Sequence, residues 1–305
     1  MKELASHWVG CPICGGSEFV VLARNDRYRM RLRTVGCCTC GFLFTNPQPT
    51  PDALRGFYTT TYRELYQSIS TPSLEYIDKF HKHERAEAVC QHMLAKLEIG
   101  DRLRTIVDIG CAEGSLLLAV GKHLSDAKRF GVEVNEAFRS FASSHADATV
   151  LSSIDELPKA RFDLVILNHV LEHVADPCDY LRQVRELLAP LGRLYLAVPD
   201  ACAYRSVGDL HIAHLFHYTK TSLGRLLRHA GFEVATMEIT EPPNHPVSIA
   251  AVARIGDASA TAPFELDVAG WRNIRSANRY RLLFYARRSP PVRWLASRAK
   301  DVLRK

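Results

Sequence analysis

Long apolar segments are missing from this chain of 305 residues, although 47% of its residues are hydrophobic. No stretch approaches the roughly 20 consecutive apolar residues that a membrane-spanning helix needs. The first residues carry no apolar signal core ahead of a cleavage site, and neither internal repeats nor low-complexity segments occur. These absences argue against a membrane-spanning, fibrous or disordered protein. We expect a globular cytoplasmic protein with one large domain and one or two small ones.

Acidic residues are scarce at the C-terminal end. The whole chain has a formal net charge of +6, yet the stretch from Trp271 to Lys305 alone carries eleven basic residues and one acid, Asp301. The remainder is therefore net acidic and offers no broad positive face, which disfavours a nucleic-acid partner. Residues 292–305 have an apolar helical face flanked by basic side chains. This pattern predicts a helix that lies peripherally on the anionic inner membrane surface, binds another anionic partner, packs on the protein or joins an oligomer.

Five of the nine cysteines crowd between positions 11 and 40, which is not the distribution of a disulfide scaffold in a chain of this length. Four of them form two Cys-x-x-Cys-Gly motifs, whose spacing lets four thiolates bind one tetrahedral Zn²⁺. Such a closed site leaves no open position for water, so we assign it a structural role. We expect a zinc ribbon over residues 1–50, with Cys38 as a surplus thiol. The predicted metal ligands are Cys11, Cys14, Cys37 and Cys40.

From Thr105 onward, short apolar runs alternate with helical patterns, which indicates β-α-β units and a parallel sheet. The last two runs are separated only by a loop and predict an antiparallel hairpin that closes the sheet. We therefore expect an α/β domain over 99–256, preceded by a helical connector or lid at 51–98 and followed by a basic helical extension at 257–305. The expected strands are 105–109, 129–133, 149–151, 162–167, 193–198, 233–238 and 248–254, and the expected helices are 76–97, 114–124, 135–145, 178–188 and 221–230.

A nucleotide-type ligand site is indicated where the first strand of this domain meets the first helix. Gly110 and Gly114 let the backbone approach a ligand closely. Glu133 ends the next strand, where an acid can bind both hydroxyls of a ribose. The G-x-G-x-x-G pattern of nicotinamide-binding sites is missing, because Ala112 and Ser115 stand at its second and third glycines. A nicotinamide cofactor is therefore disfavoured.

Residues 107–115 resemble the first motif of class I S-adenosylmethionine-dependent methyltransferases, an acid followed by G-x-G-x-G, with Ala112 at the middle glycine. Residues 162–177, which contain the sequence Leu-Glu-His-Val, resemble the fourth strand of that family and the loop after it. Together with the turns at 188–194 and 230–232, the resemblance spans about residues 105 to 255.

The N-terminal region resembles a subgroup of that family in which a Cys₄ ribbon precedes the catalytic domain, here with residues 40–47 as its end. The resemblance implies a Rossmann-like fold and S-adenosylmethionine as cofactor. It places Glu133 at the ribose, Val134 at the adenine, and Asn168 and His169 at the methyl-donor end. The other residues that it implies for the amino-acid and ribose end are Asp108, Gly110, Cys111 and Gly114.

Two histidine-rich stretches follow the fourth and fifth strands. Methyl transfer from a sulfonium depends mainly on positioning, but a hydroxyl acceptor gains from a base, and histidine suits that role near neutral pH. We expect His173, His214 and His217 to be the catalytic candidates. Glu172 with His173 also resembles family members that use a divalent metal, in which an acid precedes the pair where this chain has His169. A metal-assisted variant is therefore an alternative.

The leading hypothesis is O-methylation of a sugar, a glycan or another small polar acceptor. Methylation at a sugar carbon is the close alternative, because related ribbon-bearing enzymes act on keto-sugars. RNA methylation guided by the ribbon is less favoured. A non-catalytic adaptor would not need the intact Asp108, Gly110 and Glu133.

Overall fold

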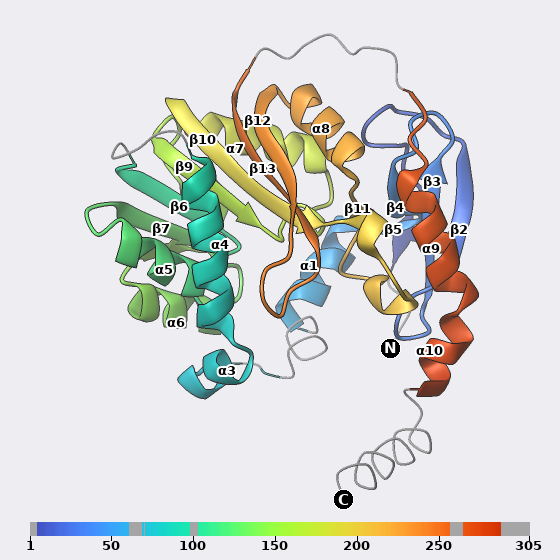
Figure 1. Cartoon of the computed structure of the whole chain (residues 1–305), viewed down its shortest axis with the longest axis horizontal. Coiled ribbons are helices and arrows are strands. Elements are labelled where there is room, and N and C mark those ends of the chain that lie inside the picture. Colours follow the sequence, from blue (N-terminus) through green and yellow to red (C-terminus); the bar gives the residue numbers. More distant parts are fainter. Residues whose placement is uncertain (1–4, 61–68, 70, 98–102, 257–264, 288–305) are drawn as a thin grey trace, which may run out of the picture.

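The computed structural model describes residues 5–60, 69, 71–97, 103–256 and 265–287. It contains a seven-stranded sheet with helices on both faces and, beside it, a four-stranded sheet that carries the cysteine motifs (Figure 1). Across these described ranges, no helix is long and apolar enough to cross a membrane. The helix expected within 292–305 lies outside the described residues.

The seven-stranded sheet has the order β12-β13-β10-β9-β6-β7-β8. Pairing is parallel from β10 to β8, whereas β13 runs antiparallel to both β10 and β12. This confirms the mostly parallel sheet with its closing hairpin. The chain order reverses between β6 and β9, and ligands of open α/β sheets bind at such a switch point. The strands are β6 (Thr105–Ile109), β7 (Lys128–Val132), β8 (Thr149–Leu151), β9 (Phe162–Asn168), β10 (Leu188–Pro199), β12 (Phe232–Thr240) and β13 (Ser248–Ile255).

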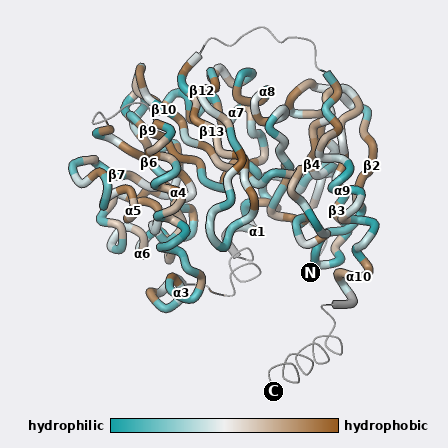
Figure 2. The backbone as a smooth tube through the Cα atoms, in the orientation of Figure 1, coloured by the Kyte–Doolittle hydropathy of each residue, from teal (hydrophilic) through white to brown (hydrophobic). Residues whose placement is uncertain are grey.

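Helices cover the two faces of this sheet, with α4 crossing one face and α7 and α8 the other (Figure 1). Met93 of α4 is fully buried with Ile106 and Tyr195 of the strands, while Leu181 of α7 joins the core on the opposite face. Hydrophobic residues accordingly concentrate in the strands (Figure 2). The helices of this unit are α3 (Leu74–Lys79), α4 (Lys82–Lys96), α5 (Ser115–His123), α6 (Glu136–Ala146), α7 (Pro177–Leu187) and α8 (Lys220–His229).

The single helix expected over 76–97 is wrong. The chain forms α3 and α4 instead, because His81 adopts a left-handed conformation with φ of 50° and separates them. No glycine or proline marks this break, so the helical pattern runs through it in the sequence. The strand expected at 193–198 also begins earlier, at Leu188, where it pairs with Phe162 ahead of a register shift.

The ribbon sheet is not built from residues 1–50 alone. Its order is β11-β4-β3-β2, and β11 comes from the chain that follows β10. Phe216 of β11 pairs with Phe44 of β4 and stacks on Phe42, with ring centroids 5.8 Å apart. The larger unit therefore supplies an edge strand to the ribbon. The strands are β2 (Phe19–Asn25), β3 (Arg31–Cys37), β4 (Leu43–Thr45) and β11 (Phe216–His217), and a separate pair joins β1 (Ser6–His7) to β5 (Gln48–Pro49).

The first part of the basic extension packs on the ribbon as α9 (Ala269–Arg279), followed by α10 (Arg281–Arg287) (Figure 1). Trp271 of α9 donates a hydrogen bond from Nε1 to the Gly41 carbonyl at 2.8 Å. A Cβ atom on Gly36 would overlap the Trp271 ring, so this glycine allows the close approach of the helix. Ile274 is fully buried beneath it.

Replacing Trp271 by Ala should lower the free energy of unfolding by about 2 kcal/mol, because the change removes a half-buried ring and its hydrogen bond. Urea unfolding would measure the loss. Arg272→Ala, at an exposed position of the same helix, should stay within about 0.5 kcal/mol of the parent protein. Equal stability of the two variants would show that α9 does not hold the ribbon.

Candidate active site

The glycine turn after β6 has the conformation that its sequence requires. Gly110 and Gly114 have φ angles of 78° and 83°, in the left-handed region. Ala112 also has a positive φ, 50°, so it adopts there a conformation that favours glycine. The amides of Gly110 and Cys111 donate to the Val132 carbonyl at 2.8 and 3.0 Å, which ties the turn to the end of β7.

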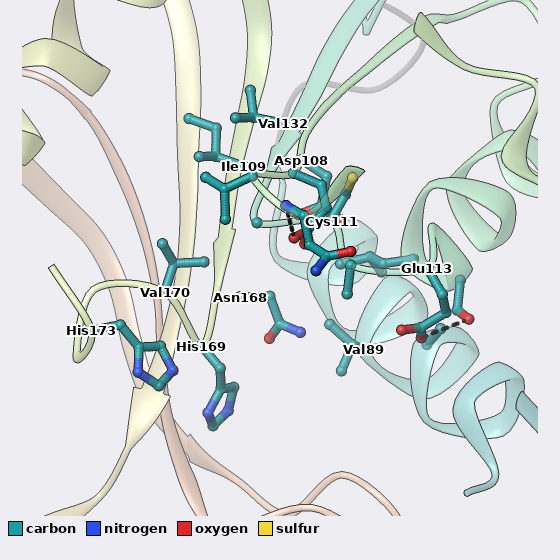
Figure 3. Close-up of a pocket in the computed structure, with 18 of the residues that line it drawn as sticks. Val89, Asp108, Ile109, Cys111, Glu113, Val132, Asn168, His169, Val170 and His173 are labelled. Carbon is teal, nitrogen blue, oxygen red and sulfur yellow. Dashed lines mark hydrogen bonds between the residues drawn. The ribbon is translucent and has the colours of Figure 1, made fainter. Parts of the chain in front are cut away.

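A cavity of about 440 Å³ opens at this turn, at the carboxyl ends of β6, β7 and β9. Its size suits a small-molecule ligand. Figure 3 shows Asn168 between His169 and Glu113, with Val89 of α4 nearby. Val134 is 61% exposed, so its side chain is available to a planar group at the cavity wall. The residues predicted for the cofactor that line this cavity are Asp108, Gly110, Cys111, Glu133, Val134, Asn168 and His169.

Gly114 is the exception among the predicted cofactor residues, because it is not part of the cavity lining. A Cβ atom on Gly114 would lie 3.1 Å from the Cβ of Ala146 and 3.2 Å from that of Ala142. The absence of a side chain at Gly114 therefore serves the contact between the start of α5 and helix α6. Its predicted role at the cofactor stays a prediction.

Three acidic residues, Asp108, Glu113 and Glu133, line the cofactor cavity. Asp108 is almost fully buried, and this burial, together with the charges of Glu113 and Glu133, raises its pKa to about 8. Glu133 Oε1 accepts a hydrogen bond from the Asn135 amide at 2.9 Å, which orients its carboxylate. Acceptor groups in this number suit a ligand that carries hydroxyl groups and positive charge.

Residues that the sequence did not single out complete the cavity. Glu113 accepts a hydrogen bond from Ser115 at 3.0 Å and lies 3.6 Å from the Lys82 ammonium. Lys82 and Arg85 belong to α4, in the region expected to be a connector or lid. Glu113 lies inside the recognised motif and could have been noted there. The side chains of α4 carry no local signal, since only the packing of that helix brings them to the cavity.

Glu172 is the buried centre of a histidine cluster. Its side chain is 1% exposed, and its Oε1 lies 3.2 Å from Nδ1 of His169 and 3.9 Å from Nε2 of both His173 and His214. Burial raises the pKa of Glu172, but the neighbouring charges of His173 and His169 outweigh that effect and hold the pKa below its ordinary value. The carboxylate is therefore ionised near neutral pH.

The hydrogen bonds around His173 define its neutral tautomer. Tyr58 donates from its hydroxyl to the Ala213 carbonyl at 2.9 Å, and Nδ1 of His173 lies 2.7 Å from the same carbonyl. A carbonyl oxygen only accepts, so Nδ1 carries the proton and Nε2 offers a lone pair in the neutral ring. Tyr58 comes from α1 (Pro51–Thr60), and nothing in its local sequence indicated this contact.

The structure separates the three histidines that were predicted to be catalytic. His173 lines the cofactor cavity and a neighbouring cavity of about 480 Å³, and His214 lines the latter. His217 is 1% exposed, lies in β11 and lines neither cavity. Its Nδ1 meets the Tyr204 hydroxyl at 3.2 Å, and burial lowers its pKa to about 4. We correct its role from base to buried partner of Tyr204.

The four predicted metal ligands converge. Sγ of Cys11 lies 3.6 Å from that of Cys40, and Sγ of Cys14 lies 3.5 Å from that of Cys37. All four sulfur atoms lie within 4.8 Å of one another, and none forms a disulfide. Ligands at the Zn–S distance of about 2.3 Å stand about 3.8 Å apart in a tetrahedron. The thiols therefore fit a zinc ion, whereas the exposed Cys38 lies outside the group.

Comparisons with known proteins identify the family of this chain. The model of a family described as a methyltransferase domain matches residues 81–237, about half of the chain. The chain belongs to this family, within the class I S-adenosylmethionine-dependent methyltransferases.

Two curated relatives cover only part of the chain. It is 28% identical over 193 residues to an uncharacterized 37.1 kDa protein in transposon TN4556 of Streptomyces fradiae, which covers 57% of this chain and 56% of that protein. It is 30% identical over 122 residues to a ubiquinone biosynthesis O-methyltransferase of Coxiella burnetii, with 36% and 51% covered. The chain thus spans about half the length of these relatives.

A solved methyltransferase structure is similar in fold to this chain. It is the 1,6-didemethyltoxoflavin-N1-methyltransferase of Burkholderia thailandensis, with 1,6-didemethyltoxoflavin and S-adenosylhomocysteine bound. The TM-score is 0.52 at 19% identity, and the match covers 71% of this chain and 96% of that one. At this identity the likeness supports the fold alone.

Glu133→Ala should weaken S-adenosylmethionine binding by about 10- to 100-fold, because charged hydrogen bonds to the ribose are lost. Isothermal titration would measure the change. Glu136→Ala, at an exposed position of α6, is the matched control and should leave the affinity unchanged. Binding of NAD⁺ instead, or equal affinities in both variants, would contradict the assignment of Glu133.

Proposed function

We propose that this protein transfers a methyl group from S-adenosylmethionine to a hydroxyl of a small polar acceptor, with sugars and glycans as the first candidates. The observation that carries the proposal is the placement of His173. Its Nε2 offers a lone pair at the junction of the two cavities, beside the ionised Glu172. A base in that position suits a hydroxyl acceptor.

The residues of the first cavity fit the cofactor. Glu133 would accept hydrogen bonds from the ribose hydroxyls, and Val134 offers an exposed apolar contact for the adenine. Glu113 supplies negative charge near the turn, where the ammonium of the amino-acid end is favoured, and Asp108 adds a buried carboxyl group whose pKa is raised to about 8. When bound, S-adenosylmethionine supplies a methyl group on a sulfonium, with a neutral thioether as leaving group.

The chain's own residues would accept the proton that the acceptor hydroxyl loses. The acceptor oxygen would gain the methyl group that the bound cofactor supplies, and the electron pair of the broken carbon–sulfur bond would stay on the neutral thioether. His173 Nε2 takes the hydroxyl proton, and Glu172 stabilises the resulting imidazolium. The Ala213 carbonyl, which also accepts from Tyr58, holds the ring by its Nδ1 proton.

His173→Ala should lower kcat by about 10²- to 10⁴-fold, because a general base contributes that much. The affinity for S-adenosylmethionine should change little. A panel of sugars, glycans and nucleotide sugars would be incubated with the cofactor, and methylated products detected by mass spectrometry. His123→Ala, which alters another histidine–glutamate pair on the surface, is the control.

The outcome of that panel separates the alternatives. If no acceptor is methylated while the cofactor binds, the proposal fails and the non-catalytic adaptor gains support. A product with a carbon-bound methyl group would favour the sugar C-methyltransferase, whereas RNA methylation lost on deletion of the ribbon would favour the RNA enzyme.

A metal-assisted reaction is the second candidate, because Glu172, His173 and His214 each present a ligand atom within 4.8 Å of the others. Two imidazoles and a carboxylate beside an open cavity are a ligand set for first-row divalent ions. In this case a chelator that leaves the thiolate-bound metal in place should abolish activity, and Mn²⁺ should restore it. Activity that survives the chelator would exclude this variant and retain His173 as the base.

We also propose that the four ribbon thiolates bind one structural Zn²⁺. Cys11→Ser should therefore lower the zinc content by about one ion per chain and destabilise the protein by at least about 3 kcal/mol. Elemental analysis and thermal unfolding would measure these effects. Cys38→Ser should keep both zinc and stability, since Cys38 is exposed and outside the group. Equal zinc content in the two variants would refute the site.

A further inference from the structure

The second cavity, of about 480 Å³, adjoins the cofactor cavity. Lys82, Arg85, His169, His173 and His245 line both spaces, so the two are contiguous. Since the first cavity suits the cofactor, the second is where the acceptor would lie. If the proposed function holds, the residues that line the wall of this second cavity therefore indicate the chemical class of the acceptor.

The charged groups of this wall are mainly cationic. Lys79, Lys82 and Arg85 line it, whereas Glu172 is the only carboxylate among the described residues that line it. The Glu172 carboxylate is enclosed by three imidazoles and is almost fully buried. The accessible part of the wall is thus positive, which suits an anion better than a neutral molecule.

Among the described residues, Arg85 makes no close ion pair, although the charge of Glu113 acts on it at longer range. Within the described ranges, no carboxylate lies within 4.0 Å of its guanidinium, and no hydrogen bond satisfies that group. Lys82, in contrast, lies 3.6 Å from Glu113 and its ammonium lies 5.1 Å from the Tyr76 ring centroid. A partly buried guanidinium with no carboxylate in contact is unfavourable. A carboxylate or phosphate would satisfy it with charge-assisted hydrogen bonds.

The break between α3 and α4 brings these cations together. Lys79 lies in the last turn of α3, and Lys82 and Arg85 lie three residues apart at the start of α4. Residues with this spacing share a helix face. The left-handed turn at His81 joins the two helices, and His81 itself lines the same cavity. The local conformation thus presents cations from two helices to one space.

We propose that Lys79 and Arg85 bind a carboxylate or phosphate group of the acceptor, and that the substrate class is an anionic hydroxylated small molecule. This inference rests on the proposed function. The carboxylate of the cofactor is a second source of the same chemistry for Arg85, which lines both cavities. Lys79 lines only the second cavity. An anion that depends on Lys79 is therefore bound at the acceptor side, whereas one that depends on Arg85 alone could be the carboxylate of the cofactor.

Isothermal titration of the full chain with pyrophosphate and with malonate measures directly whether the second cavity binds a phosphate or a carboxylate. The protein would be titrated both alone and saturated with S-adenosylhomocysteine. We expect binding that weakens by about tenfold or more in Lys79→Gln and in Arg85→Gln. Lys96→Gln is the matched control, because Lys96 lies at the far end of α4 and pairs with Glu238. It should bind like the parent protein.

Three results would overturn the inference: no anion binding by the parent protein, equal binding by all variants, or loss of S-adenosylhomocysteine affinity in Arg85→Gln with unchanged pyrophosphate binding. The last result would assign Arg85 to the cofactor. If the parent protein fails to bind S-adenosylhomocysteine, the proposed function is contradicted, and the titration without that ligand still tests the cationic wall. The two failures are therefore distinguishable.

Paired acceptors extend the test to turnover. Glucose 6-phosphate with glucose, and protocatechuate with catechol, differ by one anionic group each. For any pair that is methylated, we expect kcat/KM to favour the anionic member by about tenfold or more, and Lys79→Gln to reduce that preference. A preference for the neutral member, or one unaffected by Lys79→Gln, would overturn the inference.

Discussion

The pairing of β11 with the ribbon sheet holds the two halves of this protein together. The Thr45 amide donates to the Leu215 carbonyl at 2.7 Å, and the Leu215 amide donates to the Glu172 carbonyl at 2.8 Å. Two consecutive backbone hydrogen bonds through Leu215 thus link the ribbon to Glu172, the residue at the centre of the histidine cluster. The ribbon is therefore part of the frame of the catalytic edge. A zinc ion in the thiolate site would stabilise that frame, because Cys37 ends β3 and β3 pairs with β4.

The two cavities differ in charge, and this difference organises the proposed chemistry. The acidic residues Asp108, Glu113 and Glu133 line the cofactor side alone, whereas Lys79 lines the acceptor side alone and Lys82 and Arg85 line both. His169 and His173 line both cavities. A positively charged methyl donor and an anionic acceptor would each meet complementary charge and would be brought together at these histidines.

Much of this arrangement could be predicted because its signals are local. The strands at 105–109 and 149–151 have the expected bounds, since short apolar runs between turns indicate buried parallel strands. Glu133 and the cysteine motifs were recognisable because the spacing between neighbouring residues defines what a single turn can present. Gly114 shows the limit of such reasoning: its motif was recognised, but its contact with Ala142 and Ala146 depends on how α6 packs.

The sequence by itself determined the α/β class, the glycine turn, the acidic strand end and the two thiol pairs, because each depends on residues close together in the chain. Only the tertiary structure decided which histidine reaches the cavities. His173 and His217 look alike as histidines near a sheet edge, yet one lines the cavity and the other is buried in a ribbon strand. The sharing of β11, the contact of Tyr58 with His173, and the cationic wall from α3 and α4 depend on long-range packing. That packing is set by the burial of apolar faces across the whole chain, for which no short stretch of sequence carries a code.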